Sequence, residues 1–145
     1  ARVYGDAQVD GNAVVSGNAK VSDNAQVYGK ALVYDKAQVY GNARVYGNAV
    51  VDSNAKVSGN AEVSDDAWVY DNAKVYGDAQ VCGDTEVYGN AKVYDYAKIS
   101  GKAKVYGNAW VAGNTHVSGH THVPGTANEL SDGLNDLSSQ DDIQL

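Results

Sequence analysis

The sequence of 145 residues contains no phenylalanine and no methionine, and it has a single cysteine and a single proline. Leucine occurs only at Leu32 and in the last sixteen residues, so alanine and valine supply most of the apolar content. Side chains this small cannot fill a wide globular core to native packing density. The lone Cys82 excludes an intrachain disulfide and a cysteine-rich metal site.

The chain also lacks an excess of positive charge, since its formal net charge is -7. Residues 1–126 carry all eleven lysines and arginines, whereas five of the 18 acidic residues lie in residues 127–145. Proteins that bind nucleic acid normally show a strongly basic stripe. No apolar run is long enough to cross a bilayer, and no signal-peptide core opens the chain. We therefore expect neither nucleic acid nor a membrane as partner, and the sequence indicates no compartment.

Twenty-one consecutive six-residue units run without insertion or deletion from Ala1 to Thr126. The unit is Ala-x-Val-x-Gly-Asn. Its first position is alanine except at Thr85, Thr115 and Thr121, and its third is valine except at Ile99. A short fixed period of this kind is typical of a solenoid, in which each repeat buries its apolar face against its neighbours.

Within each unit the alanine and the valine stand two residues apart, so on an extended segment they point to the same side. The variable second and fourth residues then point outward. Glycine, aspartate and asparagine tolerate the left-handed backbone region that a sharp corner requires. The pattern therefore predicts a short strand and a corner in every unit.

An aliphatic residue followed four positions later by a small residue recurs along the chain, as in Val3 and Ala7, Val9 and Ala13, and Val117 and Thr121. In this pattern the chain resembles the hexapeptide-repeat, left-handed parallel β-helix family over residues 1–126. The resemblance implies an all-β fold, a single-stranded left-handed parallel β-helix with eighteen residues in each triangular coil. Seven coils would form a rod roughly 33 Å long, followed by a short C-terminal helical or irregular cap.

If eighteen residues make one turn, residues eighteen apart stack and each face of the prism can be assigned. The second face, which starts at Gln8, carries mixed polar residues and is expected to be solvated. The first face, which starts at Arg2, carries a ladder of cations beside tyrosines. Such a surface is suited to an anionic polymer, although lysine and tyrosine are also common on an ordinary soluble strand surface. The polymer-binding candidates are Lys20, Lys56, Lys74, Lys92, Tyr40, Tyr76 and Tyr94.

The third face starts at Val14 and differs from the others, because its first four outward residues form an apolar strip: Val14, Leu32, Val50 and Trp68. Tyr34 and Tyr70 lie next to it, and Tyr70, Tyr88 and Tyr106 are expected to stack. An exposed apolar strip favours a partner, and the resemblance implies trimers with prisms side by side. We therefore expect these six residues to form a self-association surface; the alternative is a scatter of tolerated surface residues.

The corner after the third face places asparagines in one stack. We expect an amide ladder along the axis, interrupted by Lys36 and formed by Asn18, Asn54, Asn72, Asn90 and Asn108.

The three histidines, His116, His120 and His122, lie close together in the sequence and are weak candidates for a metal site. They are expected on two different faces and a corner, so we predict neither a metal nor another cofactor. Many members of the family are acyltransferases that use acyl-CoA or acyl-carrier-protein donors and a histidine near a protruding loop. This chain has no such loop in residues 1–126, and we assign no catalytic residue and no small-molecule substrate. A partial or degenerate acyltransferase-like protein remains the alternative.

Residues 127–145 break the period and form an acidic tail. Leu130, Leu134 and Leu137 have helical spacing, which predicts a helix that covers the last coil. A disordered tail, or a tail docked on another molecule, is the alternative.

Ice binding by a flat face of the solenoid is a further alternative. It would require a regular threonine array, and three of the four threonines occupy inward positions, so the sequence does not favour it.

The sequence favours a structural or interaction module without catalytic activity. We expect a rigid rod that forms a homo-oligomer or filament, either laterally through the apolar strip or end to end. The second arrangement is suggested by the whole number of coils in residues 1–126, which lets the two ends match in phase.

Overall fold

The computed structural model describes residues 1–125, 129–130 and 136–137. Every element in these residues is a two-residue strand, and the strands form three parallel sheets. The sheet of the first face contains β1 (Arg2–Val3), β4 (Lys20–Val21), β7 (Gln38–Val39), β10 (Lys56–Val57), β13 (Lys74–Val75), β16 (Lys92–Val93), β19 (Trp110–Val111) and β22 (Glu129–Leu130).

The sheet of the second face contains β2 (Gln8–Val9), β5 (Gln26–Val27), β8 (Arg44–Val45), β11 (Glu62–Val63), β14 (Gln80–Val81), β17 (Lys98–Ile99), β20 (His116–Val117) and β23 (Asp136–Leu137). The sheet of the third face contains β3 (Val14–Val15), β6 (Leu32–Val33), β9 (Val50–Val51), β12 (Trp68–Val69), β15 (Glu86–Val87), β18 (Lys104–Val105) and β21 (His122–Val123). The described residues contain no helix that is long and apolar enough to span a membrane.

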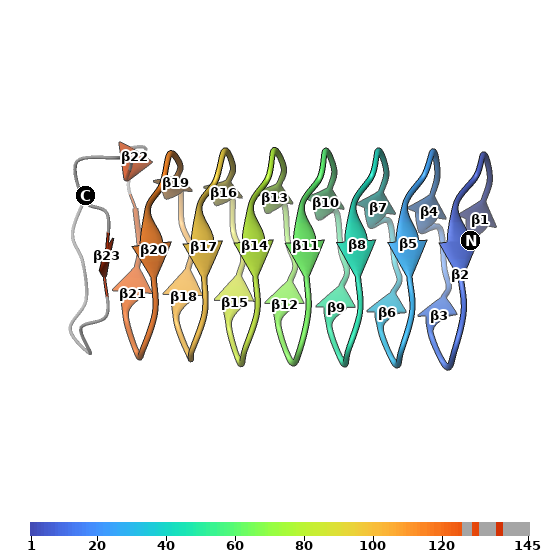
Figure 1. Cartoon of the computed structure of the whole chain (residues 1–145), viewed down its shortest axis with the longest axis horizontal. Coiled ribbons are helices and arrows are strands. Elements are labelled where there is room, and N and C mark those ends of the chain that lie inside the picture. Colours follow the sequence, from blue (N-terminus) through green and yellow to red (C-terminus); the bar gives the residue numbers. More distant parts are fainter. Residues whose placement is uncertain (126–128, 131–135, 138–145) are drawn as a thin grey trace.

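The predicted register is confirmed, because paired residues in the first 125 positions are eighteen apart, as in Lys56↔Lys74 and Val57↔Val75. Three strands make one coil, and seven coils follow one another along the axis (Figure 1). As the chain advances from its N-terminus, it descends through the nearer strands of Figure 1, such as β2, and returns through the more distant ones. This sense is left-handed, as the resemblance implied.

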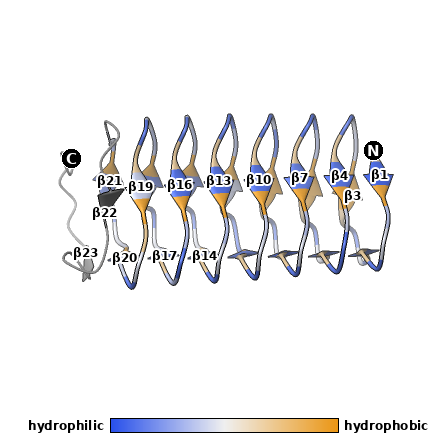
Figure 2. Cartoon of the chain, turned by 90° about the horizontal axis from the view of Figure 1, so that it is seen from above, coloured by the Kyte–Doolittle hydropathy of each residue, from blue (hydrophilic) through white to orange (hydrophobic). Residues whose placement is uncertain are grey.

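The core is a column of small side chains inside the prism. From Ala19 onward the inward alanines and valines are fully buried, and Thr85, Thr115 and Thr121 are buried at alanine positions. Figure 2 shows a polar residue followed by an apolar one in strands of the first face such as β10 and β13. The alternation of the hexad therefore sets which side chains enter the core.

The corners explain the fifth position of the repeat. The backbone φ angle is positive at this position in every unit, from Gly5 to Gly125, including six units with aspartate or serine. Glycine adopts this region without the steric cost of a Cβ atom, and aspartate tolerates it better than most residues. Several of the aspartates also use their carboxylate, as when Asp23 Oδ2 accepts a hydrogen bond from the Gly41 N–H at 3.0 Å.

Side-chain amide ladders are present, but the longest is not at the predicted corner. After the first face, Asn24 donates to Asn42, which donates to Asn60 at 3.2 Å, and Asn60 donates to Asp78 at 3.0 Å. At the predicted corner after the third face, the described residues show one amide hydrogen bond of this kind, from Asn90 to Asn108 at 3.3 Å. These bonds link consecutive coils and are structural.

The predicted C-terminal helix is wrong for the part of the tail that the structure describes. Leu130 belongs to β22 and pairs in parallel register with Val111, whereas Leu137 belongs to β23 and pairs with Val117. Backbone pairing on the open edge of the last coil is available to any sequence, so it replaces the helix that the leucine spacing indicated. Leu134, the third leucine of that pattern, lies outside the described residues.

Candidate interaction surfaces

The apolar strip is continuous along the third face. Strand pairing places Val14 beside Leu32, Leu32 beside Val50, and Val50 beside Trp68. Val14, Leu32 and Trp68 are 49%, 37% and 40% exposed, and all three are among the exposed large hydrophobic residues of the described chain. Val50 is half-buried. The four residues predicted from the sequence are therefore brought together on one flat sheet.

A buried carboxylate lies beside this strip, at a residue that the sequence analysis did not select. Asp52 follows β9 and is only 5% exposed. Its Oδ2 accepts a hydrogen bond from the Trp68 indole Nε1 at 2.7 Å, and its Oδ1 accepts one from the Ser53 hydroxyl at 2.8 Å. The sequence signal was present, because Asp52 interrupts a row that otherwise carries Tyr34 before it and Tyr70 after it.

The two tyrosines predicted next to the strip lie on either side of Asp52 along the axis, and their hydroxyls are held in the neutral form. Burial, a side-chain hydrogen bond to Asp52 and the charge of that carboxylate raise the pKa of Tyr34 to about 12. Burial and the nearby carboxylate of Glu86 raise the pKa of Tyr70 to about 12. These two hydroxyls therefore add no charge beside the strip over the physiological pH range.

The predicted tyrosine stack on the third face is confirmed. The Tyr70 and Tyr88 rings are parallel with centroids 4.9 Å apart, and the Tyr88 and Tyr106 centroids are 5.1 Å apart. Trp68 contacts Tyr70 at a centroid distance of 4.9 Å and a tilt of 44°. The strip and the tyrosine stack thus form one connected apolar and aromatic surface.

On the first face the lysines form a ladder in direct register. Lys56 pairs with Lys74, and Lys74 pairs with Lys92, whose ammonium lies 4.8 Å from the centroid of the Trp110 ring. None of the four lysines of this face, which also include Lys20, makes an ion pair with another described residue. By contrast, Arg44 pairs with Glu62 at 3.7 Å on the second face, and Lys104 pairs with Glu86 at 3.4 Å on the third.

The tyrosines of the first face do not present free ring faces along its whole length. The Tyr76 and Tyr94 rings stack on each other with centroids 4.9 Å apart and planes inclined by 2°. Near the start of the face, serine replaces tyrosine at Ser22, and a hollow of about 290 Å³ lies there. The hollow is lined by Tyr4, Lys20, Ser22, Asp23, Gln38 and Tyr40.

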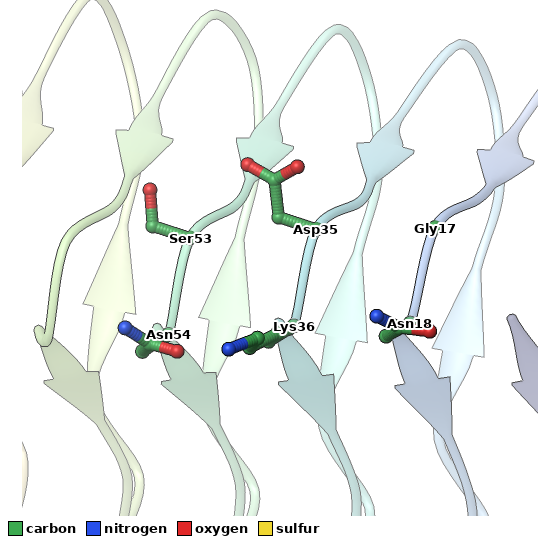
Figure 3. A pocket seen from close by; sticks show the side chains of 6 residues that line it. All are labelled: Gly17, Asn18, Asp35, Lys36, Ser53 and Asn54. Carbon is green, nitrogen blue, oxygen red and sulfur yellow. The ribbon is translucent and has the colours of Figure 1, made fainter.

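A second recess lies on the corner after the third face. Figure 3 shows the Lys36 side chain standing between Asn18 and Asn54, in the row where the asparagine ladder was predicted. Gly17, Asp35 and Ser53 complete the lining. Lysine cannot accept a hydrogen bond from an amide, so no amide ladder can pass through Lys36, and the recess is a shallow interval between successive corners.

The histidines do not converge. His116 is exposed on the second face, His120 is exposed at a corner, and His122 is half-buried on the third face. Within the residues that the structure describes, no group of three histidine, cysteine or acidic side chains is placed to hold a metal ion. Burial and the charge of Asp65 raise the pKa of the Cys82 thiol, which disfavours the reactive thiolate.

Comparison with known proteins agrees with this architecture. The family model described as YdcK beta solenoid repeat matches residues 37–52, the segment of β7, β8 and β9 that makes up most of the third coil. The comparisons with curated proteins and with solved structures gave no match. The repeat match supports the solenoid and does not assign an activity to any residue.

Proposed function

We propose that this chain, a parallel β-solenoid, is a non-catalytic structural module that associates laterally with copies of itself through the apolar strip. The observation that carries the proposal is the continuous register of Val14, Leu32, Val50 and Trp68 on the flat third face. Contiguous apolar side chains at a monomer's surface are typical of protein interfaces.

The hydrogen bond to Asp52 makes Trp68 suitable for burial against a partner. A tryptophan that enters an interface usually needs a partner for its indole N–H, and an unsatisfied donor would cost about 1–3 kcal/mol. Here Asp52 Oδ2 already accepts that bond at 2.7 Å within the chain. The rest of the ring is therefore free to contact apolar groups, and we expect Trp68 to contribute most to the interface.

The size of the strip indicates the strength of the association. Four coils span roughly 15–20 Å of the axis, so a strip that is one side chain wide covers much less area than the roughly 800 Å² per partner of stable interfaces. Association also costs at least about 4 kcal/mol of translational and rotational freedom. We therefore expect a concentration-dependent equilibrium in which Tyr34 and Tyr70 extend the contact beyond the strip.

The test is the mass of the chain in solution, measured by analytical ultracentrifugation across a wide range of protein concentration. We expect the average mass of the unaltered chain to rise with concentration, whereas the Trp68→Lys variant should keep the mass of a monomer at every concentration. Trp110→Lys is the matched control, because Trp110 is the other tryptophan of the chain and lies on the first face, away from the strip. This variant should behave like the unaltered chain. A monomer at every concentration for the unaltered chain would refute the proposal, as would equal effects of the two substitutions.

A further inference from the structure

The basic ladder of the first face is electrostatically unsatisfied within the described part of the chain. Lys56, Lys74 and Lys92 stand directly above one another in the sheet. Like charges directly opposite on neighbouring strands are destabilising. On the second face Arg44 forms an ion pair with Glu62, and on the third face Lys104 forms one with Glu86. The first face has no acidic residue at any outward strand-row position between Arg2 and Ala112.

Three of the four acidic side chains at the adjoining corner in residues 1–125 are engaged elsewhere. The Asp23 carboxylate accepts from the Gly41 N–H at 3.0 Å, and the Asp95 carboxylate accepts from the Gly113 N–H at 3.2 Å. Asp78 accepts from the Asn60 amide at 3.0 Å. These carboxylates brace the corners, and the ladder keeps its positive charge for a ligand outside the chain.

The hollow above Ser22 gives this charged face a recess that can receive part of a ligand. Ser22 is 7% exposed and forms part of the floor. Tyr4 and Tyr40 belong to coils on either side of it, so their backbones are about 9–10 Å apart along the axis. That interval admits one ring between the two aromatic side chains. Lys20 and Gln38 line the same hollow and provide hydrogen-bond donors.

We infer that the first face binds a linear acidic polysaccharide that lies along the solenoid axis. Its carboxylate or sulfate groups pair with Lys20, Lys56, Lys74 and Lys92, and one sugar ring enters the hollow between Tyr4 and Tyr40. The lysines of the ladder repeat at the coil interval of about 4.8 Å along the axis, so a polyanion that lies along the axis can pair with several of them at once. Binding removes the like-charge repulsion of the ladder.

The same surface is poorly suited to nucleic acid. Sequence-tolerant binding of single strands uses aromatic ring faces on which bases stack, but Tyr76 and Tyr94 stack on each other. A duplex strand places its phosphates about 3.4 Å apart along the axis, which does not follow a coil interval of about 4.8 Å. The inference is independent of the proposed self-association, because that strip lies on a different face.

The experiment is isothermal titration of the full chain with polygalacturonate, with its fully methyl-esterified form and with oligothymidylate. We expect binding to polygalacturonate that weakens as salt is added, because the contacts are ionic, and no binding to the uncharged ester. The double substitution Lys56→Gln and Lys74→Gln should weaken binding by at least about tenfold. Its matched control, Lys98→Gln with Lys102→Gln, removes the same charge from exposed positions outside the ladder and should leave the affinity within about twofold.

A second pair of variants tests the hollow. Tyr40→Ala should weaken polygalacturonate binding about tenfold, whereas Tyr106→Ala on the third face should leave it unchanged, with circular dichroism confirming that both variants fold. No binding of polygalacturonate, equal binding of the methyl ester, tighter binding of oligothymidylate, or equal losses in the two lysine variants would each overturn the inference.

Discussion

The indole N–H of Trp68 donates to the Asp52 carboxylate across 2.7 Å, joining the second residue of one hexad to the fourth residue of the hexad one coil earlier. This diagonal contact fixes the tryptophan on the third face. Because Asp52 also accepts from the Ser53 hydroxyl and lies among Trp68, Tyr34 and Tyr70, it connects the apolar strip to the aromatic residues beside it.

Asp52→Ala is expected to destabilise the chain. The substitution leaves the Trp68 indole N–H and the Ser53 hydroxyl without their acceptor, which should lower the free energy of unfolding by about 1–3 kcal/mol. The measurement is urea denaturation followed by circular dichroism. Asp10→Ala is the control, because Asp10 occupies the same hexad position on the second face and is exposed; its effect should stay within about 0.5 kcal/mol. Equal losses from the two variants would contradict this role of Asp52.

Thr85→Val is expected to stabilise the chain. The Thr85 hydroxyl is fully buried and has no hydrogen-bond partner among the described residues. Valine replaces that hydroxyl by a methyl group of similar size, so removing the unsatisfied oxygen should raise the free energy of unfolding by about 1 kcal/mol. Thermal and urea denaturation would measure the change.

Thr85→Ser is the matched variant for this position. It retains the unsatisfied hydroxyl and deletes the methyl group, so it should lower the free energy of unfolding by about 1 kcal/mol. A loss of stability in Thr85→Val as large as in Thr85→Ser would show that the hydroxyl is satisfied in solution.

Alkaline pH is expected to unfold the solenoid through its tyrosines. Burial and neighbouring groups raise the pKa of Tyr34 and Tyr70 from 10.0 to about 12 in the folded chain. The folded state therefore binds these protons more tightly than the unfolded state does. This contribution to stability is fully present below pH 10.0 and is lost as the pH rises toward about 12.

Unfolding free energies measured by urea titration at a series of pH values would check this window. The double variant Tyr34→Phe with Tyr70→Phe keeps both rings but cannot ionise, so its stability should fall less steeply over the same range. Some loss should remain, because burial also raises the pKa of Tyr28 and of Tyr88. Identical pH profiles for the variant and the unaltered chain would contradict the assignment to Tyr34 and Tyr70.

Much of the fold could be predicted because each coil repeats one set of local choices. Alanine and valine at the first and third positions of the hexad predicted the buried column. The fifth position predicted the corners, which adopt positive φ angles at residues as different as Gly101 and Asp35. The tail could not be predicted in the same way. Leu130 and Leu137 have helical spacing, but the open sheet edge offered hydrogen bonds that the spacing does not encode.

The candidate surfaces were predictable only in part. The eighteen-residue register placed Val14, Leu32, Val50 and Trp68 on one strip and the lysines on one ladder. It did not reveal the role of Asp52, because that depends on the direction in which the Trp68 ring turns. It also did not reveal that the Tyr76 and Tyr94 rings stack on each other.

By itself the sequence determined the path of the backbone, because a strict hexad fixes which residues are buried, which turn the corners and which stack eighteen positions apart. The tertiary structure decided how the outward side chains use those positions. Rotamers depend on neighbours in the coils above and below, and these neighbours set the Trp68 to Asp52 bond, the stacked tyrosines and the hollow above Ser22. Such contacts are absent from any single repeat, so only the assembled coils define them.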